Sequence, residues 1–440
     1  MDGMCDVIVV GAGPAGATAA RLCALAGLET LIVERAVFPR DKPCAGGLSP
    51  RVLADITRVF SLEPQETGEP AEGANTAGPD PGPVLRVPRL SLRAHLHHAS
   101  RPGLWSGYRR IRVDTPTPLM YLADRARLDA RLADGAVQAG ARVLWGTEAV
   151  TWRQDAAGVD VTAREAGDRG APPRSALVRL FRGQYLIGAD GAVSVVARGL
   201  TRRPGPAAGC LSLRLALGKE QAERVTRGAL DFHFGIVRAG YGWAFPGAGG
   251  LAVGVGGIIP PGAYGFYASL ETPLGRVLGT YGLDTSVAGA APKRWMVPLG
   301  GVRRGWVEGR VLLAGDAAGV ADPVTGEGIG PAVRSGAMAA RAVVTALRGG
   351  RAASVPETYA AALGLREGER GEGHRGRGKE GAYERDLWES EIARQRRGLW
   401  VTRAAGKLPP GWQSLMFRRS VFAWVAGKMG SRATGGERHG

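Results

Sequence analysis

The chain has 440 residues, of which 45% are hydrophobic, enough for more than one globular domain, and its formal net charge at pH 7 is +17. Its four cysteines form no C-x-x-C pair, so no metal or iron–sulfur site is expected, and free thiols favour a cytoplasmic protein. The basic residues are scattered rather than interleaved with aromatic residues on one platform, which argues against nucleic acid as a partner.

The N-terminal stretch from Asp6 to Glu34 predicts a strand, a glycine turn, a helix and a second strand. The apolar run Val7–Val10 is typical of a buried parallel strand. A G-x-G-x-x-G pattern follows it and precedes a helix of small residues, Ala17–Ala26. Such glycines allow a tight turn, the approach of a pyrophosphate and close helix–strand packing. The expected loop residues are Gly11, Gly13, Pro14, Ala15 and Gly16.

Glu34 is expected to bind the sugar of the same nucleotide. It ends the second strand, Leu31–Val33, and lies 18 residues after Gly16, where a carboxylate can accept both hydroxyls of an adenosine ribose. The order of strand, turn, helix and acid therefore favours a dinucleotide site over a chance glycine turn.

Helix and strand patterns alternate along the rest of the chain. Helices are predicted at Val52–Phe60 and Leu122–Ala139, and a loop or insertion at Glu63–Pro83. Tyr185–Arg198 predicts a buried strand, a sharp turn and a helix start, and Val311–Val343 predicts a strand, a loop and a helix. The uncharged run Ala239–Leu270 has the length of a membrane span, but its glycines and alternating apolar residues predict strands instead.

We therefore predict a mixed α/β (α+β) fold. A Rossmann-like dinucleotide domain, residues 1–62, 118–204 and 301–350, is interleaved with a β-rich substrate domain, residues 84–117 and 205–300. Residues 351–440 are expected to form a C-terminal helical region, with a charged, glycine-rich linker at 366–385.

The C-terminal segment Trp412–Met429 has the pattern of a basic amphipathic helix. Such a helix either packs on the body of the protein or lies reversibly on an anionic membrane surface. The net charge of +17 has the same ambiguity, because it fits anionic lipid, a diphosphate substrate or a general compositional bias towards arginine.

Three separated patterns favour FAD as the dinucleotide. Besides the first glycine loop, the turn at Asp190 and Gly191 follows a strand, as a second nucleotide-contacting loop does. Asp316 follows the strand Val311–Ala314, where it can hydrogen-bond a ribityl hydroxyl. The loop Asp322–Gly330 leads into a helix whose N-terminus can stabilise the negative charge of a reduced flavin. No histidine or cysteine lies in a known attachment motif, so the FAD is expected to be non-covalent.

From about residue 5 to 347 the chain resembles the geranylgeranyl reductase family of FAD-dependent oxidoreductases, within the para-hydroxybenzoate hydroxylase-like flavoproteins. The segments that carry the resemblance read GAGPAGATAA, KPCAGGLSPR, YLADRARLDARL, LIGADGAVSVVAR, GYGWAFP and LLAGDAAGVADPVTGEGIG. The resemblance implies that a Cys-x-Gly-Gly loop lines the flavin and that a Y-x-W-x-F-P motif lines the substrate pocket. It therefore implies catalytic roles for Cys44, Tyr241 and Trp243, and substrate contacts for Arg238, Tyr241, Trp243, Phe245 and Pro246.

The resemblance and the three patterns together give the remaining expected FAD contacts. These are Glu34, Arg35, Cys44, Ala45, Gly46, Gly47, Arg125, Ala149, Asp190, Gly191, Asp316, Pro323, Gly326, Gly328, Ile329 and Gly330. Two positions depart from the family, since Ala45 stands where glycine is usual and Arg238 where proline is usual.

Several of these residues keep a second interpretation. Cys44 is either a functional thiol, whose pKa Lys42 can lower, or a small buried hydrophobe. Tyr241 and Trp243 share one strand face, so both line the pocket or both are buried in packing. Arg238 is either a solvated surface residue or a diphosphate ligand.

The resemblance implies an enzyme that saturates double bonds of an isoprenoid chain. Reduced flavin would give a hydride equivalent to one alkene carbon, and an acid or water would give a proton to the other. The substrate would be a prenyl lipid or a prenyl diphosphate. The electron donor would be NAD(P)H or ferredoxin, and NAD(P)H would have to bind transiently because no second G-x-G-x-x-G follows a strand. An FAD-dependent monooxygenase or hydroxylase that uses NAD(P)H and O₂ remains the alternative. The sequence leaves the oligomeric state open.

Overall fold

The computed structural model describes residues 4–62, 85–86, 91–101, 104–113, 120–167, 178–200, 205–247, 250–288, 291–300 and 306–349. The loop at Glu63–Pro83, the linker at 366–385 and the amphipathic segment Trp412–Met429 lie outside these residues, so their predictions stay predictions.

The largest of the three sheets in the described residues is built mainly from parallel strands. Its order is β17-β18-β11-β1-β2-β8, and β9 and β10 continue from β11 as antiparallel neighbours. The strands are β1 Cys5–Val10, β2 Thr30–Val33, β8 Arg142–Leu144, β9 Thr147–Gln154, β10 Val159–Glu165, β11 Val178–Gly188, β17 Val307–Glu308 and β18 Val311–Leu313. Every residue of β2 and all but one of β1 are buried, as expected for central parallel strands.

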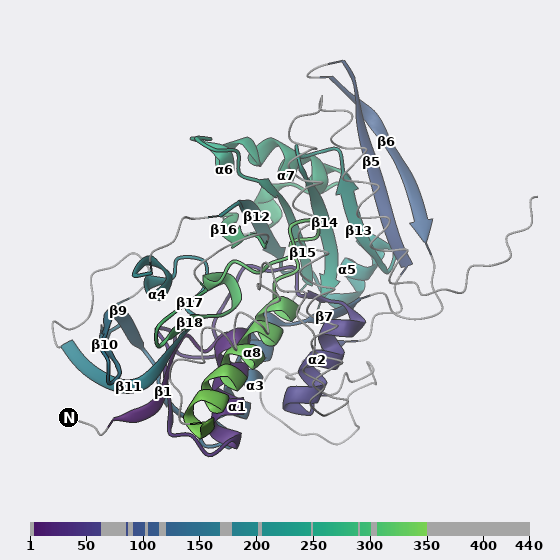
Figure 1. Cartoon of the computed structure of the whole chain (residues 1–440). Helices are drawn as coiled ribbons and strands as arrows, with labels where there is room; N and C mark the ends of the chain where they lie inside the picture. Colours follow the sequence, from purple (N-terminus) through teal and green to yellow (C-terminus); the bar gives the residue numbers. More distant parts are fainter. Residues whose placement is uncertain are drawn as a thin grey trace, which may run out of the picture.

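Three helices lie together beside β1 (Figure 1): α1 Pro14–Leu25, α3 Arg125–Gln138 and α8 Ile329–Gly349. α1 begins at Pro14 rather than at the predicted Ala17, because proline is well tolerated in the first turn of a helix. α3 begins at Arg125 rather than at Leu122, because the Asp124 carboxylate caps the helix by accepting the Ala126 and Arg127 N–H groups at 2.9 and 3.2 Å.

A second sheet has seven strands in the order β16-β12-β15-β14-β13-β5-β6. Its strands are β5 Ser91–Arg101, β6 Leu104–Val113, β12 Ala207–Leu215, β13 Ala229–Phe234, β14 Gly240–Gly247, β15 Gly250–Ile258 and β16 Lys293–Pro298. The run Ala239–Leu270 thus contains β14 and β15 and no spanning helix. No described helix is both long enough and apolar enough to cross a bilayer.

The two faces of the second sheet carry different apolar clusters. One cluster packs under α7 Glu271–Gly279 and includes Leu213, Val253 and Val255. The helices α5 Lys219–Thr226 and α6 Phe266–Ser269 accompany it, within a region that the sequence predicted to be β-rich and for which it predicted no helix. The other cluster is rich in aromatic residues, including Phe232, Trp243 and Phe245.

A short third sheet has the strand order β3-β7-β4, and its central strand β7 lies above α2 in the view of Figure 1. It consists of β3 Gly47–Leu48, β7 Tyr121–Ala123 and β4 Leu85–Arg86, and α2 Pro50–Phe60 follows β3. The remaining described elements are α4 Val195–Arg198 and two short 3₁₀ helices, η1 Thr285–Ala288 and η2 Gly315–Ala317. These elements confirm the predicted mixed α/β fold.

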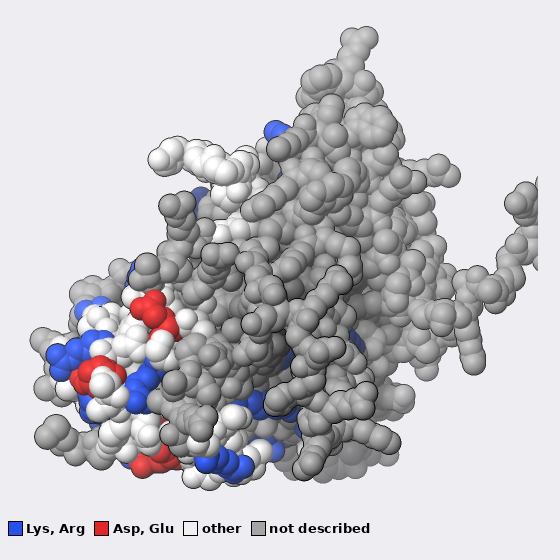
Figure 2. Space-filling model, viewed as in Figure 1, with Lys and Arg blue, Asp and Glu red and all other residues white. Residues whose placement is uncertain are grey.

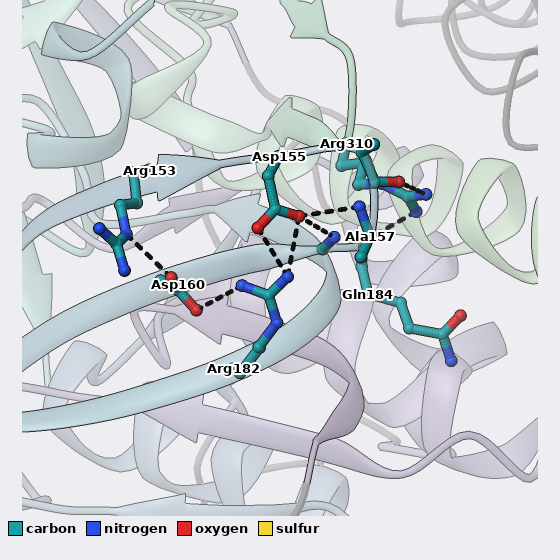
Figure 3. Close-up of polar contacts among 9 residues, drawn as sticks. Arg153, Asp155, Ala157, Asp160, Arg182, Gln184 and Arg310 are labelled. Carbon is teal, nitrogen blue, oxygen red and sulfur yellow. Dashed lines mark hydrogen bonds and ion pairs between the residues drawn. The ribbon is translucent and has the colours of Figure 1, made fainter.

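The outer hairpin of the larger sheet carries mixed charge rather than a basic patch. Lys and Arg alternate with Asp and Glu over the region of β9, β10 and β11 (Figure 2). Arg182 lies between Asp155 and Asp160, at 2.8 Å from each, and Arg153 donates to Asp160 at 2.9 Å (Figure 3). Hydrogen bonds from Arg182 hold the pKa of Asp155 at about 2. This part of the surface is therefore largely self-neutralised.

Candidate active site

The first glycine loop has no room for side chains at two of its glycines. A Cβ at Gly16 would overlap the Gly11 carbonyl oxygen, and one at Gly11, where φ is +99°, would overlap the Ala189 carbonyl oxygen. Pro14 and Ala15 form the first turn of α1, whose free N–H groups face the loop. The loop is thus shaped as a cradle in which backbone rather than side chains meets a phosphate.

The Glu34 carboxylate is fixed beside this loop at the end of β2. One oxygen accepts the Ala12 N–H at 2.6 Å and the other accepts the Ala36 N–H at 2.8 Å. The side chain is 5% exposed, whereas its neighbour Arg35 is exposed. The geometry therefore brings Glu34 to the loop and leaves Arg35 at the surface.

Two arginines share one buried aspartate next to the loop. Arg125 donates to Asp129 through Nε and Nη2 at 3.0 and 2.9 Å, and Arg40 Nη2 lies 3.0 Å from the same carboxylate. Arg40 Nη2 also lies 3.6 Å from the position of a Cβ on Gly13. Burial acts to raise the pKa of Asp129, but the two arginines outweigh it and lower that pKa. The sequence did not predict a role for Arg40. The i, i+4 spacing of Arg125 and Asp129 could have indicated their ion pair, but no such pattern links Arg40 to Asp129.

The Cys44 loop meets different partners from those predicted. The Cys44 sulfur accepts the Gly46 N–H at 3.3 Å. Burial acts to lower the pKa of Arg125, but Asp129 and, after it, Cys44 outweigh burial and raise that pKa. Lys42 instead lies 3.5 Å from an Asp316 oxygen and over the ring of Trp295. The cation that interacts with the Cys44 sulfur is therefore Arg125, whereas the predicted partner, Lys42, pairs with Asp316.

The second turn has mainly a structural function for its aspartate. Asp190 accepts from the Ser194 hydroxyl at 2.5 Å and from the Val195 N–H at 2.6 Å, and so caps the short helix α4. Burial raises the pKa of Asp190 against these hydrogen bonds. Gly191 has a positive φ of 83°, and Ala149 is buried within β9. The Asp190 side chain is thus committed to α4, and a cofactor contact at this turn would come from the backbone.

The last loop approaches the site from β18 and α8. Asp316 lies in η2, and the Asp322 carboxylate shapes the loop by accepting the Val324 and Thr325 N–H groups at 2.9 and 2.8 Å. Pro323, Gly326 and Gly328 follow this turn, and Ile329 and Gly330 open α8. The N-terminus of α8, at Gly328 and Ile329, therefore lines the same cavity as the Cys44 loop.

A cavity of about 200 Å³ joins these loops to the aromatic face of the second sheet. Its described lining includes Cys44 to Gly47, Tyr241, Trp243, Phe245 and Pro323 to Ile329. The Tyr241 hydroxyl donates to the Thr325 carbonyl at 2.5 Å, and burial raises the pKa of Tyr241. The structure thus brings the predicted Cys44, Tyr241 and Trp243 together, and of the two interpretations of the aromatic pair it favours the pocket wall.

Four lining or neighbouring residues differ from the sequence predictions. Arg238 is exposed and Pro246 is buried outside the described lining, so neither lies on the cavity wall. Cys210 and Glu327 do line it and were missed. Burial raises the pKa of the Cys210 thiol to about 12. Alternation along β12 could have predicted that Cys210 lies on the cavity-facing side of the second sheet, but it could not have predicted that Cys210 lies near Cys44.

The residues present fit FAD. The glycine cradle accepts a pyrophosphate, Glu34 stands at the ribose end, and Asp316 with the α8 N-terminus stands at the flavin end. Among the described residues, no group of His, Cys, Asp and Glu could hold a metal ion. Fold and site together define an FAD-dependent oxidoreductase.

Comparisons with known proteins agree with this class. A family model described as an FAD binding domain matches residues 4–213 and 293–364. The chain is 31% identical over 361 residues to a menaquinone reductase of Mycobacterium tuberculosis, covering 77% of this chain and 76% of that one. It is 30% identical over 354 residues to digeranylgeranylglycerophospholipid reductase 1 of Methanopyrus kandleri, covering 78% and 81%. The chain belongs to the geranylgeranyl reductase family of FAD-dependent oxidoreductases.

A solved structure shares the fold. It is a geranylgeranyl bacteriochlorophyll reductase-like protein of Thermoplasma acidophilum, with a TM-score of 0.66, 21% identity and 97% of each chain covered. The p-nitrophenol 4-monooxygenase PnpA of Pseudomonas putida also resembles the chain, with a TM-score of 0.59, 15% identity and coverage of 99% of this chain and all of that one. The two comparisons therefore agree on the fold of the chain.

Proposed function

We propose that this protein saturates a carbon–carbon double bond in an isoprenoid chain. The observation that carries the proposal is the apolar cavity, because it is bounded on one side by the Cys44 loop and the loop before α8, the two loops expected to contact the flavin, and on the other by aromatic side chains. An unactivated alkene reacts only when it is positioned closely, and a fitted apolar wall supplies that positioning. The names of the relatives, which include geranylgeranyl diphosphate and menaquinone reductases, support the same substrate chemistry.

Some residues of the cavity wall would bind the isoprenoid, and another would supply a proton. Bound FAD supplies a hydride equivalent in its reduced form. Tyr241 and Phe245 hold the isoprenoid against the loop of Thr325, and the cavity excludes water from it. Glu327, a carboxyl group on the cavity wall, is our candidate to hold the proton that the second alkene carbon needs.

The test is an anaerobic incubation of the FAD-loaded, dithionite-reduced protein with prenyl lipids, followed by mass spectrometry. Saturation adds two hydrogens per double bond without added oxygen. Denatured protein should also release free yellow FAD. A product that contains oxygen, formed with NAD(P)H and O₂, would instead assign a hydroxylase. Trials with NAD(P)H and with ferredoxin identify the electron donor.

We also propose reversible contact with a membrane, where prenyl lipids reside. The support is the basic amphipathic pattern of Trp412–Met429 and the net charge of +17. Flotation with anionic and neutral vesicles, with the full chain and with a chain ending at Leu408, tests it. Full-length protein that stays unbound to anionic vesicles at low salt would contradict this contact.

A further inference from the structure

A loop at one end of the second sheet exposes an aromatic side chain to solvent. Residues 259–265, called here the tip loop, connect β15 to α6, and the surface beside α6 projects from the molecule as an uncharged ridge (Figure 2). Tyr264 in this loop is 100% exposed, and among the described residues it is the only aromatic one of the exposed large hydrophobic side chains. Its ring adds nothing to the core and is free to meet a partner.

The tip loop is anchored at both ends. At its start the Ile259 N–H donates to the Ala207 carbonyl of β12 at 2.9 Å. Just after it, the Tyr267 hydroxyl of α6 donates to the Trp295 carbonyl of β16 at 3.2 Å. Two consecutive prolines within the loop restrict its backbone further. The ring of Tyr264 is therefore presented by a shaped loop rather than by a loose segment.

The cavity reaches the base of the tip loop. Ile258, the last residue of β15, lines the cavity directly before the loop begins, and Ala208 on β12 and Trp295 on β16 line it nearby. These three residues are half-buried, whereas Phe232 and Phe245, farther along the sheet, are 6% and 4% exposed. The cavity wall is thus closed at its aromatic end and more open beside the tip loop.

The charge around the tip loop fits a lipid surface. Residues 259–270 contain no charged side chain, and the exposed Arg294 lies over the ring of Tyr267, with 5.9 Å between its Cζ and the ring centroid. Tyrosine is enriched at membrane–water interfaces, and a neighbouring arginine attracts anionic lipid. A bilayer accommodates a projecting ridge, whereas a specific protein partner needs a broad complementary surface of about 800 Å² on each side.

We infer that the tip loop inserts into the interface of a lipid bilayer and that a prenyl lipid passes from the bilayer into the cavity beside it. This inference rests on the proposed function, and it assigns membrane contact to the second sheet, separately from the C-terminal segment. Tyr264 would anchor the loop among the lipid head groups. The more open end of the cavity would then face the apolar layer that already holds the prenyl chain, so the chain need not cross water.

Vesicle binding by the full-length, FAD-loaded protein tests the inference. The probes are vesicles of phosphatidylcholine, alone and mixed with phosphatidylglycerol, and the readout is the partition coefficient from co-sedimentation. Tyr264→Ser should lower this coefficient about tenfold, because moving one aromatic side chain out of water is worth a factor of that order. Tyr264→Trp, which keeps an amphipathic ring, should bind vesicles at least as tightly as the unaltered protein.

Leu180→Ser is the matched control. Leu180 is also an apolar residue with an exposed side chain, at 52%, but it lies on β11 of the largest sheet and outside the described cavity lining. Its substitution should leave vesicle binding unchanged. Flavin content per protein, measured for each variant, confirms that the FAD site has folded.

Kinetics separate the delivery of the substrate from the chemistry. With a prenyl substrate carried in vesicles, Tyr264→Ser should raise KM and leave kcat unchanged, because only access to the cavity is impaired. With a short prenyl substrate that dissolves in water, both constants should equal those of the unaltered protein.

Two results would overturn the inference. One is vesicle binding by Tyr264→Ser that equals that of the unaltered protein, since the tip loop would then not touch the bilayer. The other is a loss of self-association in Tyr264→Ser, seen by light scattering, with vesicle binding unchanged, because the loop would then contact a second copy of the chain. Failure of the proposed function looks different, because vesicle binding that depends on Tyr264 would persist while no double bond was saturated.

Discussion

Replacing Asp129 by asparagine should destabilise the protein and weaken its hold on FAD. Asp129 is fully buried and accepts from Arg125 at 2.9 and 3.0 Å, while Arg40 lies 3.0 Å away. Removing one partner of a buried ion pair costs about 3–5 kcal/mol, because the remaining charge is left uncompensated. Asparagine keeps one acceptor oxygen, and Arg40, 19% exposed, can turn towards water. We therefore expect the lower end of that range, about 3 kcal/mol.

The effect on FAD follows from where the two arginines stand. Arg40 reaches the glycine loop at Gly13, and Arg125 interacts with Cys44. Without the shared carboxylate their positions loosen, so we expect the FAD Kd to rise along with the loss of stability. Urea unfolding of the FAD-free protein gives the free energy of unfolding, and titration with FAD gives the affinity.

Asp134→Asn is the control for this experiment. Asp134 lies on the same helix α3 but is exposed, so its substitution should change the free energy of unfolding by no more than about 0.5 kcal/mol. The reasoning would be refuted if Asp129→Asn lost less than about 1 kcal/mol and bound FAD as tightly as the unaltered protein, because Asp129 would then not be the counter-ion of a buried pair.

Three further predictions concern pH, the ribose site and the thiol. The folded-state pKa of Asp129 lies below 3.8, so the stabilisation by this carboxylate is complete above pH 3.8 and is lost as the pH falls through the lower folded-state value. The difference in the free energy of unfolding between the unaltered protein and Asp129→Asn, measured in urea, should therefore be constant near neutral pH and shrink below pH 3.8. Glu34→Ala should raise the FAD Kd at least about tenfold, because charge-assisted hydrogen bonds to ribose are lost; unchanged affinity in a titration would mean that Glu34 serves only the loop. Cys44→Ser should keep its flavin, seen in its absorption spectrum, but lose most turnover, and a normal rate of saturation would make Cys44 a packing residue.

Local patterns in the sequence predicted those parts of the site whose geometry depends on neighbours in the chain. The G-x-G-x-x-G loop, Glu34 and the shared face of Tyr241 and Trp243 all follow from turn chemistry and strand alternation. Such patterns are local, so the backbone itself enforces them. The mixed α/β fold was predictable for the same reason.

Contacts between distant segments could not be predicted in this way. Lys42 stands two residues before Cys44, yet the cation beside that sulfur comes from α3 as Arg125, and Lys42 reaches Asp316 instead. Cys210 and Glu327 reach the cavity from different elements for the same reason. Which side chains meet depends on how sheets and helices pack, and one sequence does not encode that packing in any short pattern.

The order of strands in the larger sheet has a consequence for how the chain is made. Val7 pairs with Tyr185, and Leu186 pairs with Val311, so strands from the beginning, the middle and the later part of the chain lie side by side. During synthesis β1 can pair with β2 early, but its other edge stays open until β11 emerges, and β11 in turn waits for β18. Long-range parallel pairing of this kind folds slowly and exposes unpaired edges to aggregation. A nascent chain that stops before Val311 therefore lacks β18 and leaves the edge of β11 open to pairing with other chains.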